Sequence, residues 1–354
     1  MILPFYSNRF SMTRISFFKP GRLRALVETV KAHSHSARAR SFANAADGNL
    51  APSRCPIMRA TRALKSISAS AGFTLVELLV VIFVVGVLIA LLLPSLGKAR
   101  TLAKQTREQA AAAQMMVAFI AYADDNKGLI LPGYPKREWV NGPMPVFNGA
   151  GARLLNEDAQ RYPFRLAPYL NYNFRGLYQS DRLLADLREK ESEYLPSGIN
   201  YDYVVSLYPS LGLNAVFVGG SDRLLMFDRL FQNTFGRVHV ARLDQVVRAS
   251  SLLTFVSARA QEQPAVPILG KPEGFFRVDP PRFASNTANL WDNNYETNAA
   301  LPGINSGFIS LRYNGKAVCG YLDGHVGLLG WSGLNDMRNW ADQADSAGWT
   351  VRPR

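Results

Sequence analysis

The 354-residue sequence contains only two cysteines, Cys55 and Cys319. Two cysteines exclude a small disulfide-stabilised fold and any metal site built from several cysteines. The sequence also lacks the phosphate-binding loop, the nucleophile elbow, the dinucleotide fingerprint and the zinc-protease pattern of common enzyme families. Because no catalytic constellation is present, we expect a protein that is not an enzyme.

Acidic residues are almost missing from the segment 1–72, which holds 12 Lys and Arg against Glu28 and Asp47. The formal net charge of +13 therefore comes mostly from this segment, and the rest of the chain, 73–354, has a net charge of only +3. A nucleic-acid-binding protein carries its Lys and Arg as a patch or stripe on the folded body. The observed distribution argues against nucleic acid as a partner.

One long apolar run stands out from the otherwise polar chain. Residues 73–93 read FTLVELLVVIFVVGVLIALLL and contain a single charge, that of Glu77. As a helix the run would span about 31 Å, which matches the hydrocarbon core of a bilayer. A carboxylate in hydrocarbon costs roughly 3 kcal/mol or more unless it is paired, so Glu77 is a candidate functional residue. The run predicts a transmembrane helix rather than the core helix of a soluble protein.

The residues before this run differ from a secretory signal peptide, in which the small residues of the cleavage site follow the apolar stretch. Here the small residues 68–72, SASAG, precede it. Cleavage after Gly72 would remove the basic segment and leave the helix on the mature chain. It would also create a positive α-amino group on Phe73, one helical turn from Glu77.

The sequence Gly72-Phe73-Thr74-Leu75-Val76-Glu77 resembles the processing site of type IV prepilins and of the pseudopilins of type II secretion. The resemblance implies that a membrane peptidase cuts after Gly72 and then methylates the amino group of Phe73. It also implies that Glu77 guides subunit assembly. Pro94 lies where many members of that family have a proline that kinks the helix.

The same resemblance implies where the protein is found and what it contacts. We expect a single-pass protein of the bacterial inner membrane with a cytoplasmic N-terminus and an extracytoplasmic head. Its partners would be the prepilin peptidase/methyltransferase and other pilin-like subunits in a homo- or hetero-oligomeric fibre. The fibre would lie in the periplasm or on the cell surface.

A leader that ran from Met1 to Gly72 would be longer than the short basic leaders usual in that family. Met58 opens the shorter segment 58–72, MRATRALKSISASAG, which fits those leaders better. We therefore expect translation to start at Met58. Residues 58–72 would then be the leader, and residues 1–57 a non-native or disordered extension.

Good helix formers continue beyond the membrane run. Residues 94–127 are rich in Ala, Gln, Arg and Met, and small or apolar residues recur every three or four positions. This pattern predicts that the helix continues to a stop at 126–128, with a bend at Pro94 because proline removes a backbone hydrogen bond. Two separate helices joined at Pro94 are the alternative.

Residues 128–354 predict a globular head. We expect a mainly antiparallel sheet packed on the long, half-transmembrane N-terminal helix, which is an α+β, pilin-like fold. A helix is expected over 181–194 with Ser180 as N-cap, a helical turn over 244–249 and a long connection over 258–306. Strands are expected over residues 201–207, 215–218, 223–227, 238–242 and 252–256.

The segment 307–330 predicts a three-stranded meander over 308–313, 317–322 and 325–329. Its turns contain Asn-Gly and Asp-Gly, the dipeptides typical of type I′ turns. The segment resembles the prepilin-type processing-associated domain named for a His, nine residues, Asp-Gly signature. Asp323 and Gly324 match that signature and His325 extends the match, whereas Tyr313 replaces the signature His. This resemblance implies fold and context rather than chemistry.

The other polar candidates have ordinary structural explanations. Asp323 and His325 could form half of a metal or acid–base site, although a turn aspartate beside a strand histidine accounts for both. His239 is expected at an exposed strand position and Cys319 in the core. No cofactor is predicted beyond calcium, for which a polar loop offers oxygen ligands in Asp292, Asn293, Asn294 and Glu296.

The apolar run is consistent with what the prepilin resemblance implies: a structural subunit that prepilin peptidase processes and that assembles into a pseudopilus or a type IV pilus-like fibre, serving type II protein secretion. The alternative is a signal-anchored periplasmic enzyme or carbohydrate-binding protein, in which the helix is only a tether. That alternative predicts a cleft within residues 128–354.

Overall fold

The computed structural model describes residues 74–178, 183–262, 266, 270, 272–284 and 289–354. The chain divides after residue 72, and all described residues belong to the second part, residues 73–354. Gly72, Phe73, the leader, residues 1–57 and the expected N-cap Ser180 lie outside the described residues.

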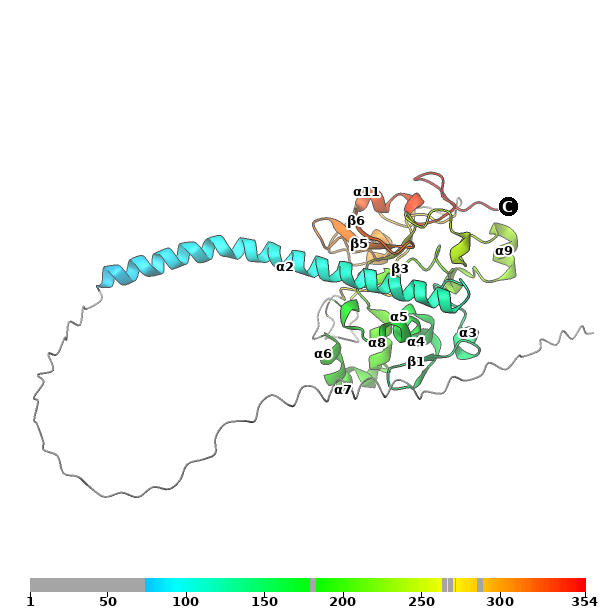
Figure 1. Cartoon of the computed structure of the whole chain (residues 1–354), viewed down its shortest axis with the longest axis horizontal. Helices are drawn as coiled ribbons and strands as arrows, with labels where there is room; N and C mark the ends of the chain where they lie inside the picture. Colours follow the sequence, from blue (N-terminus) through cyan, green and yellow to red (C-terminus); the bar gives the residue numbers. More distant parts are fainter. Residues whose placement is uncertain (1–73, 179–182, 263–265, 267–269, 271, 285–288) are drawn as a thin grey trace, which may run out of the picture. The chain divides into compact units, whose positions relative to one another are not determined.

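Helix α2 (Leu75–Asp125) is one continuous helix of 51 residues, drawn as a gently curved ribbon in Figure 1. Pro94 lies within it, so the alternative of two separate helices is not observed. The helix ends where the sequence predicts, at Asn126. Gly128 then adopts a left-handed φ of +81° and donates its N–H to the carbonyl of Ala123, a typical helix stop.

The C-terminal half of α2 is buried in the head. Its inward residues recur at helical spacing, and Ala112, Met115, Met116, Phe119 and Ala123 have no exposed surface. The helix contacts strand β5 (Lys316–Tyr321) on one side and helix α5 (Tyr162–Leu166) on the other. Figure 1 shows α2 between the sheet and a layer of short helices.

The main sheet has four antiparallel strands in the order β3-β4-β5-β6. The other three strands are β3 (Leu211–Leu213), β4 (Leu253–Ser257) and β6 (Val326–Gly330). Cys319 is central to the register, since it pairs with Val256 on β4 and with Gly327 on β6. Together with the long helix, this sheet gives the expected α+β composition.

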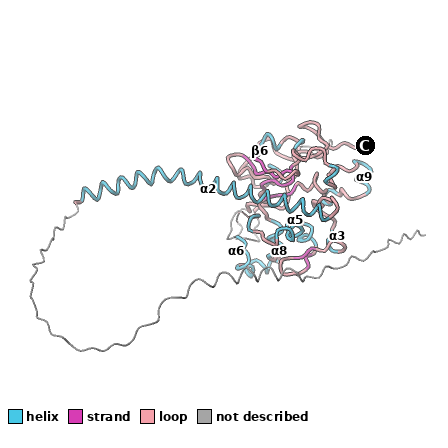
Figure 2. The backbone as a smooth tube through the Cα atoms, in the orientation of Figure 1, coloured by secondary structure: helices cyan, strands magenta, loops and turns pink. Residues whose placement is uncertain are grey.

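Short helices, short strands and loops make up the rest of the described head; Figure 2 colours the loops pink. A two-stranded sheet pairs β1 (Val146–Phe147) with β2 (Arg153–Leu154). The remaining α-helices are α3 (Arg137–Asn141), α4 (Asn156–Gln160), α6 (Leu183–Glu189), α7 (Glu191–Tyr194), α8 (Tyr201–Leu207), α9 (Arg229–Phe235), α10 (Pro302–Ser306) and α11 (Trp331–Leu334). The 3₁₀ turns are η1 (Ala167–Leu170), η2 (Arg175–Leu177), η3 (Leu195–Ser197), η4 (Asp222–Leu224), η5 (Leu243–Gln245) and η7 (Met337–Asn339).

The sheet separates two apolar clusters, because successive side chains of a strand point to opposite faces. Phe255 of β4 belongs to the cluster on the α2 face, where its ring lies 5.8 Å from that of Phe119 and 5.1 Å from that of Tyr162. Its neighbour Val256 belongs to the cluster on the opposite face, with Cys319. The prediction that Cys319 lies in the core is confirmed.

Several predicted strands are wrong. Residues 201–207 form helix α8, because Asn200 accepts the N–H of Tyr203 at 2.7 Å as an N-cap and the apolar residues face the core. Residues 215–218, 223–227 and 238–242 form turns and isolated bridges, such as the bridge between Val218 and Val240. The strand predicted over 252–256 is confirmed as β4.

The helices predicted for the head are present, with shifted bounds. The helix expected over 181–194 is present as α6 and α7, which are separated at Lys190. The turn expected over 244–249 is the shorter η5. In both cases the element type is right and the bounds are shifted.

The predicted C-terminal meander is correct for two of its three strands, β5 and β6. Residues 308–313 form no strand, and Ile309 instead makes an isolated bridge with Ala258 at the end of β4. The Asn314-Gly315 turn has positive φ at both residues, as predicted. In the second turn only Gly324 has a positive φ, because Asp323 accepts the N–H of His325 and keeps an ordinary conformation.

Candidate functional site

The first described residues close a capping box at the start of α2. The Thr74 hydroxyl accepts the N–H of Glu77 at 3.2 Å. The Glu77 Oε2 in turn accepts the Thr74 N–H at 2.9 Å and the Thr74 hydroxyl at 2.8 Å. Threonine at the N-cap with glutamate three residues later is the sequence pattern for this arrangement.

The capping box gives the Glu77 carboxylate partners within its own chain. Within the described part of the chain, these bonds all use Oε2, so Oε1 can still accept from another donor. A carboxylate with this local support costs less free energy in an apolar medium than a bare one. The Glu77 carboxylate can therefore keep its bonds to Thr74 and still accept from a positive group.

Thr74→Val should loosen this first turn, because valine can neither accept from the Glu77 amide nor donate to its carboxylate. Loss of an N-cap typically costs about 1 kcal/mol, so hydrogen exchange of the amides in the first turn of α2 should accelerate about fivefold. The measurement is made on detergent-solubilised protein, with Thr74→Ser as the control that keeps the hydroxyl. Equal exchange rates in the two variants would contradict a stabilising role for the cap.

The first half of α2 is apolar and uncovered. Each described side chain from Leu75 to Leu93 is exposed, including 68% of Phe83 and 71% of Leu91. The helix is long and apolar enough to cross a membrane. This surface is consistent with membrane anchoring, because water is a poor environment for so much apolar area. The kinking role of Pro94 stays a prediction.

A second carboxylate, Glu108, lies where the buried half of α2 begins. It is only 3% exposed. Ser257 at the end of β4 donates its hydroxyl to Oε1 at 2.5 Å, and the Tyr313 hydroxyl donates to Oε2. The Nε of Arg312 lies 3.7 Å from Oε2. The carboxylate thus joins the helix to three residues of the head.

Glu108 was not predicted as a site residue, although its spacing in the sequence carries a signal. Glu108 lies three and four positions before the buried Ala111 and Ala112, so it falls on the inward face of the helix. An acid on an inward face needs partners, and Tyr313 is one of them. The residue in the place of the signature His therefore contacts the long helix.

The structure places Asp323 and His325 side by side in a turn. The Asp323 Oδ1 accepts the N–H of His325 at 3.1 Å and lies 2.6 Å from its Nδ1. The His325 ring stacks on Tyr321, with ring centroids 4.1 Å apart. No third metal-ligating side chain joins them among the described residues. The arrangement supports the turn interpretation.

The loop considered for calcium is organised around a buried amide. The Asn305 Nδ2 donates to Asp292 Oδ2 at 3.3 Å and to the Asn294 carbonyl at 2.9 Å. The Asn305 Oδ1 accepts the N–H of Glu296 at 3.0 Å. These oxygens converge on a side-chain amide, which is sufficient to order the loop. A calcium site at residues 292–296 stays a prediction.

His239 is not at an exposed strand position, which corrects the sequence prediction. It is half-buried in a loop, and its ring packs edge-on against Phe227 with centroids 5.8 Å apart. Burial and the charge of Arg237 lower the pKa of His239 to about 4, so the ring is neutral at physiological pH.

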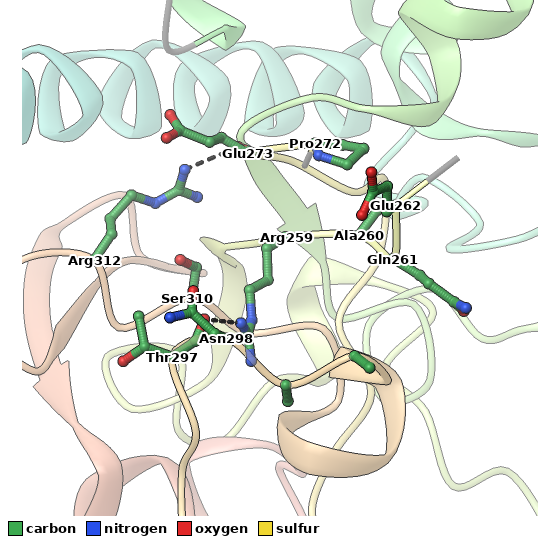
Figure 3. Close-up of a pocket in the computed structure, with 12 residues that line it drawn as sticks. Arg259, Ala260, Gln261, Glu262, Pro272, Glu273, Thr297, Asn298, Ser310 and Arg312 are labelled. Atoms are coloured by element: carbon green, nitrogen blue, oxygen red, sulfur yellow. Dashed lines mark hydrogen bonds between the residues drawn. The ribbon is translucent and has the colours of Figure 1, made fainter. Parts of the chain in front are cut away.

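Arg312, the ion-pair partner of Glu108, also lines a cavity of about 510 Å³ (Figure 3). Two of its lining residues, Arg259 and Arg312, donate to backbone carbonyls. Arg312 donates to Glu273 at 2.8 Å and to Ala258 at 2.6 Å. Arg259 donates to Glu296 at 2.6 Å. The two guanidinium groups hold the cavity walls together, which is a structural role.

Comparison with known proteins matches the N-terminal segment alone. A family model described as the prokaryotic N-terminal methylation motif matches residues 67–93, a range that contains Gly72, Phe73 and Glu77. No curated protein and no solved structure matches the chain. The match supports a type IV pilin-like protein that carries the motif of prepilin peptidase substrates, a motif of structural subunits. The resemblance of residues 307–330 to the His, nine residues, Asp-Gly domain stays a prediction.

Proposed function

We propose that this chain is a structural pilin-like subunit, or pseudopilin, with a pilin-like fold. Prepilin peptidase cuts it after Gly72 and methylates Phe73, and the mature subunit then assembles into a pseudopilus or a type IV pilus-like fibre. The fibre would serve type II protein secretion. The observation that carries the proposal is the methylation motif together with the first half of α2, to Leu93, whose apolar side chains are exposed.

The uncovered half of α2 can be buried in two places, the bilayer and a bundle of neighbouring copies. Removal of apolar surface from water is worth about 25 cal/mol per Å² in either place. Moving the helix from lipid to the bundle therefore exchanges one apolar environment for another, and the net free energy is small. This balance suits a subunit that is stored in the membrane and assembled on demand.

Glu77 would set the position of each new subunit in the bundle. A carboxylate without a positive partner is costly in an apolar bundle, so docking favours the depth at which it meets the α-amino group of a neighbour's Phe73. The free Oε1 described above is the acceptor for that contact. Lys and Arg near a membrane helix favour the cytoplasmic side, but here Lys98, Arg100 and Lys104 follow the apolar run and basic residues also precede it. The proposed cytoplasmic N-terminus therefore rests on the motif and not on the distribution of charge.

Mass spectrometry of the mature N-terminus tests the processing step. We expect the mature chain to begin with a singly methylated Phe73. Gly72→Val should leave the leader attached, because a branched side chain at the cleavage site does not fit a peptidase that accepts glycine. Ser70→Ala, in the same small-residue segment, is the matched control and should be processed normally. A native chain that retains residues 58–72, or that lacks the apolar run, would refute the proposal.

A further inference from the structure

A smaller cavity, of about 280 Å³, lies among the short helices of the head. Its volume is at the lower end of small-molecule sites, about 300 Å³, so it suits a ligand of a single ring. The lining combines aromatic side chains with charged and polar ones. The aromatic lining residues are Phe164, Tyr172, Phe174 and Tyr201.

Two of the aromatic lining residues are buried and two are half-buried. Phe164 and Phe174 are buried and pack edge-to-face with centroids 5.3 Å apart. Tyr172 and Tyr201 are half-buried and line the cavity. Arg188 lies 4.2 Å above the ring of Tyr201. The rings offer flat apolar surface next to charged and polar groups.

The polar lining residues include two carboxylates, Glu191 and Asp202, that each keep lone pairs for a ligand. Asp202 Oδ2 accepts from Asn148 at 2.8 Å, and Glu191 Oε1 accepts the N–H of Tyr201 at 2.7 Å. Each of these bonds uses one lone pair of a carboxylate, and a carboxylate has about four. Arg188 and the Nδ2 of Asn200 supply donors in the same cavity.

Local hydrogen bonds and the backbone conformation position two of the residues that line the cavity, Asn148 and Tyr172. The Oδ1 of Asn148 accepts the N–H of Ala150 at 3.1 Å and that of Ala152 at 2.9 Å, which fixes the loop. Tyr172 has a φ of +55°, a left-handed conformation that is unusual for a bulky residue. Such strain is found where a side chain must be aimed at one place, and Tyr172 lines the cavity.

We propose that this cavity binds one neutral sugar ring. A sugar ring has an apolar C–H face, which can stack on Tyr172, and hydroxyl groups that both donate and accept. The two carboxylates accept from those hydroxyls, and Arg188 and Asn200 donate to them. An anion is disfavoured by Glu191 and Asp202, and a cation by Arg188, which already occupies a face of Tyr201. The inference concerns the head alone and is independent of processing and assembly.

Saturation-transfer NMR on the full-length protein tests this proposal. The protein is solubilised in a detergent that has no sugar headgroup, and glucose, galactose, mannose and N-acetylglucosamine are added singly at millimolar concentration. We expect transfer to at least one of them, strongest at the ring C–H protons. Tyr172→Asn should weaken that binding about tenfold, since it removes the stacking surface.

Tyr172→Asn is informative because asparagine tolerates the left-handed conformation, so the turn can keep its shape. Tyr169→Asn, the same change in the same turn but outside the cavity, should leave binding unaltered. The proposal fails if none of the four sugars shows transfer, or if the Tyr172→Asn variant binds as well as the wild type. Saturable binding of glucuronate, a primary amine or calcium in place of neutral sugars would also overturn it.

Discussion

Glu108→Ala should destabilise the folded head by about 3–5 kcal/mol, the usual effect of removing one partner of a buried ionic cluster. The substitution leaves Arg312 and the hydroxyl groups of Ser257 and Tyr313 facing a gap at the surface of α2. These groups lose their shared acceptor. Chemical denaturation of the solubilised protein, followed by tryptophan fluorescence, measures the loss, because all five tryptophans lie in the head.

Two further variants separate charge from shape. Glu108→Gln keeps the volume and one acceptor, so its loss should be smaller, about 1–3 kcal/mol. Glu189→Ala, an exposed glutamate on α6, is the matched control and should change stability by less than about 0.5 kcal/mol. A loss in Glu108→Ala no larger than that control would remove the claim that the network holds the helix to the head.

Tyr313 can be tested in the same assay by a double-mutant cycle. Tyr313→Phe should cost about 1–2 kcal/mol in the wild-type background and much less in Glu108→Ala, because alanine has already removed the acceptor of the Tyr313 hydroxyl. Tyr313→His restores the signature residue of the family that this segment resembles. It should be tolerated better than Tyr313→Phe, since a histidine can also donate to Glu108.

Features carried by a local pattern were predictable from the sequence. The apolar run and the helical spacing after it give α2, including its end at Asn126. The Asn314-Gly315 turn and its flanking residues give β5. In the candidate site, the motif around Gly72, Phe73 and Glu77 was recognisable from the sequence, and the family match covers the same range. The roles of these three residues stay predictions.

Features that depend on distant partners were not predictable. The aromatic and β-branched run at 201–207 favours a strand locally, but the cap by Asn200 and burial of Val204 and Val205 make it α8. The spacing of Glu108 places it on the inward face of the helix, but its partners Ser257 and Tyr313, 149 and 205 residues away in the sequence, could not be identified from that spacing. The sugar cavity combines several separate segments, so no single stretch of sequence could indicate it.

Glu77→Ala should abolish fibre assembly while leaving processing intact. In the proposed function the peptidase acts at Gly72, whereas the carboxylate would matter only when the mature helix docks against other helices. Without it, no depth of insertion is favoured, and the α-amino group of the neighbour's Phe73 is left without a partner in an apolar bundle. We expect a normal methylated N-terminus by mass spectrometry and a loss of at least about tenfold in sheared fibres by immunoblot.

The matched variants distinguish charge from helix stability. Val76→Ala changes an apolar neighbour on the same turn and should assemble normally. Glu77→Gln keeps the capping hydrogen bonds to Thr74 but not the negative charge, so it should fail as Glu77→Ala does. If Glu77→Gln assembled at the wild-type yield, the carboxylate would be acting only as a helix cap, and the contact with a neighbour's amino group would be excluded. Failure of both Glu77 variants alongside normal assembly of Val76→Ala would instead assign the loss to the charge, because Thr74 keeps its cap in Glu77→Gln.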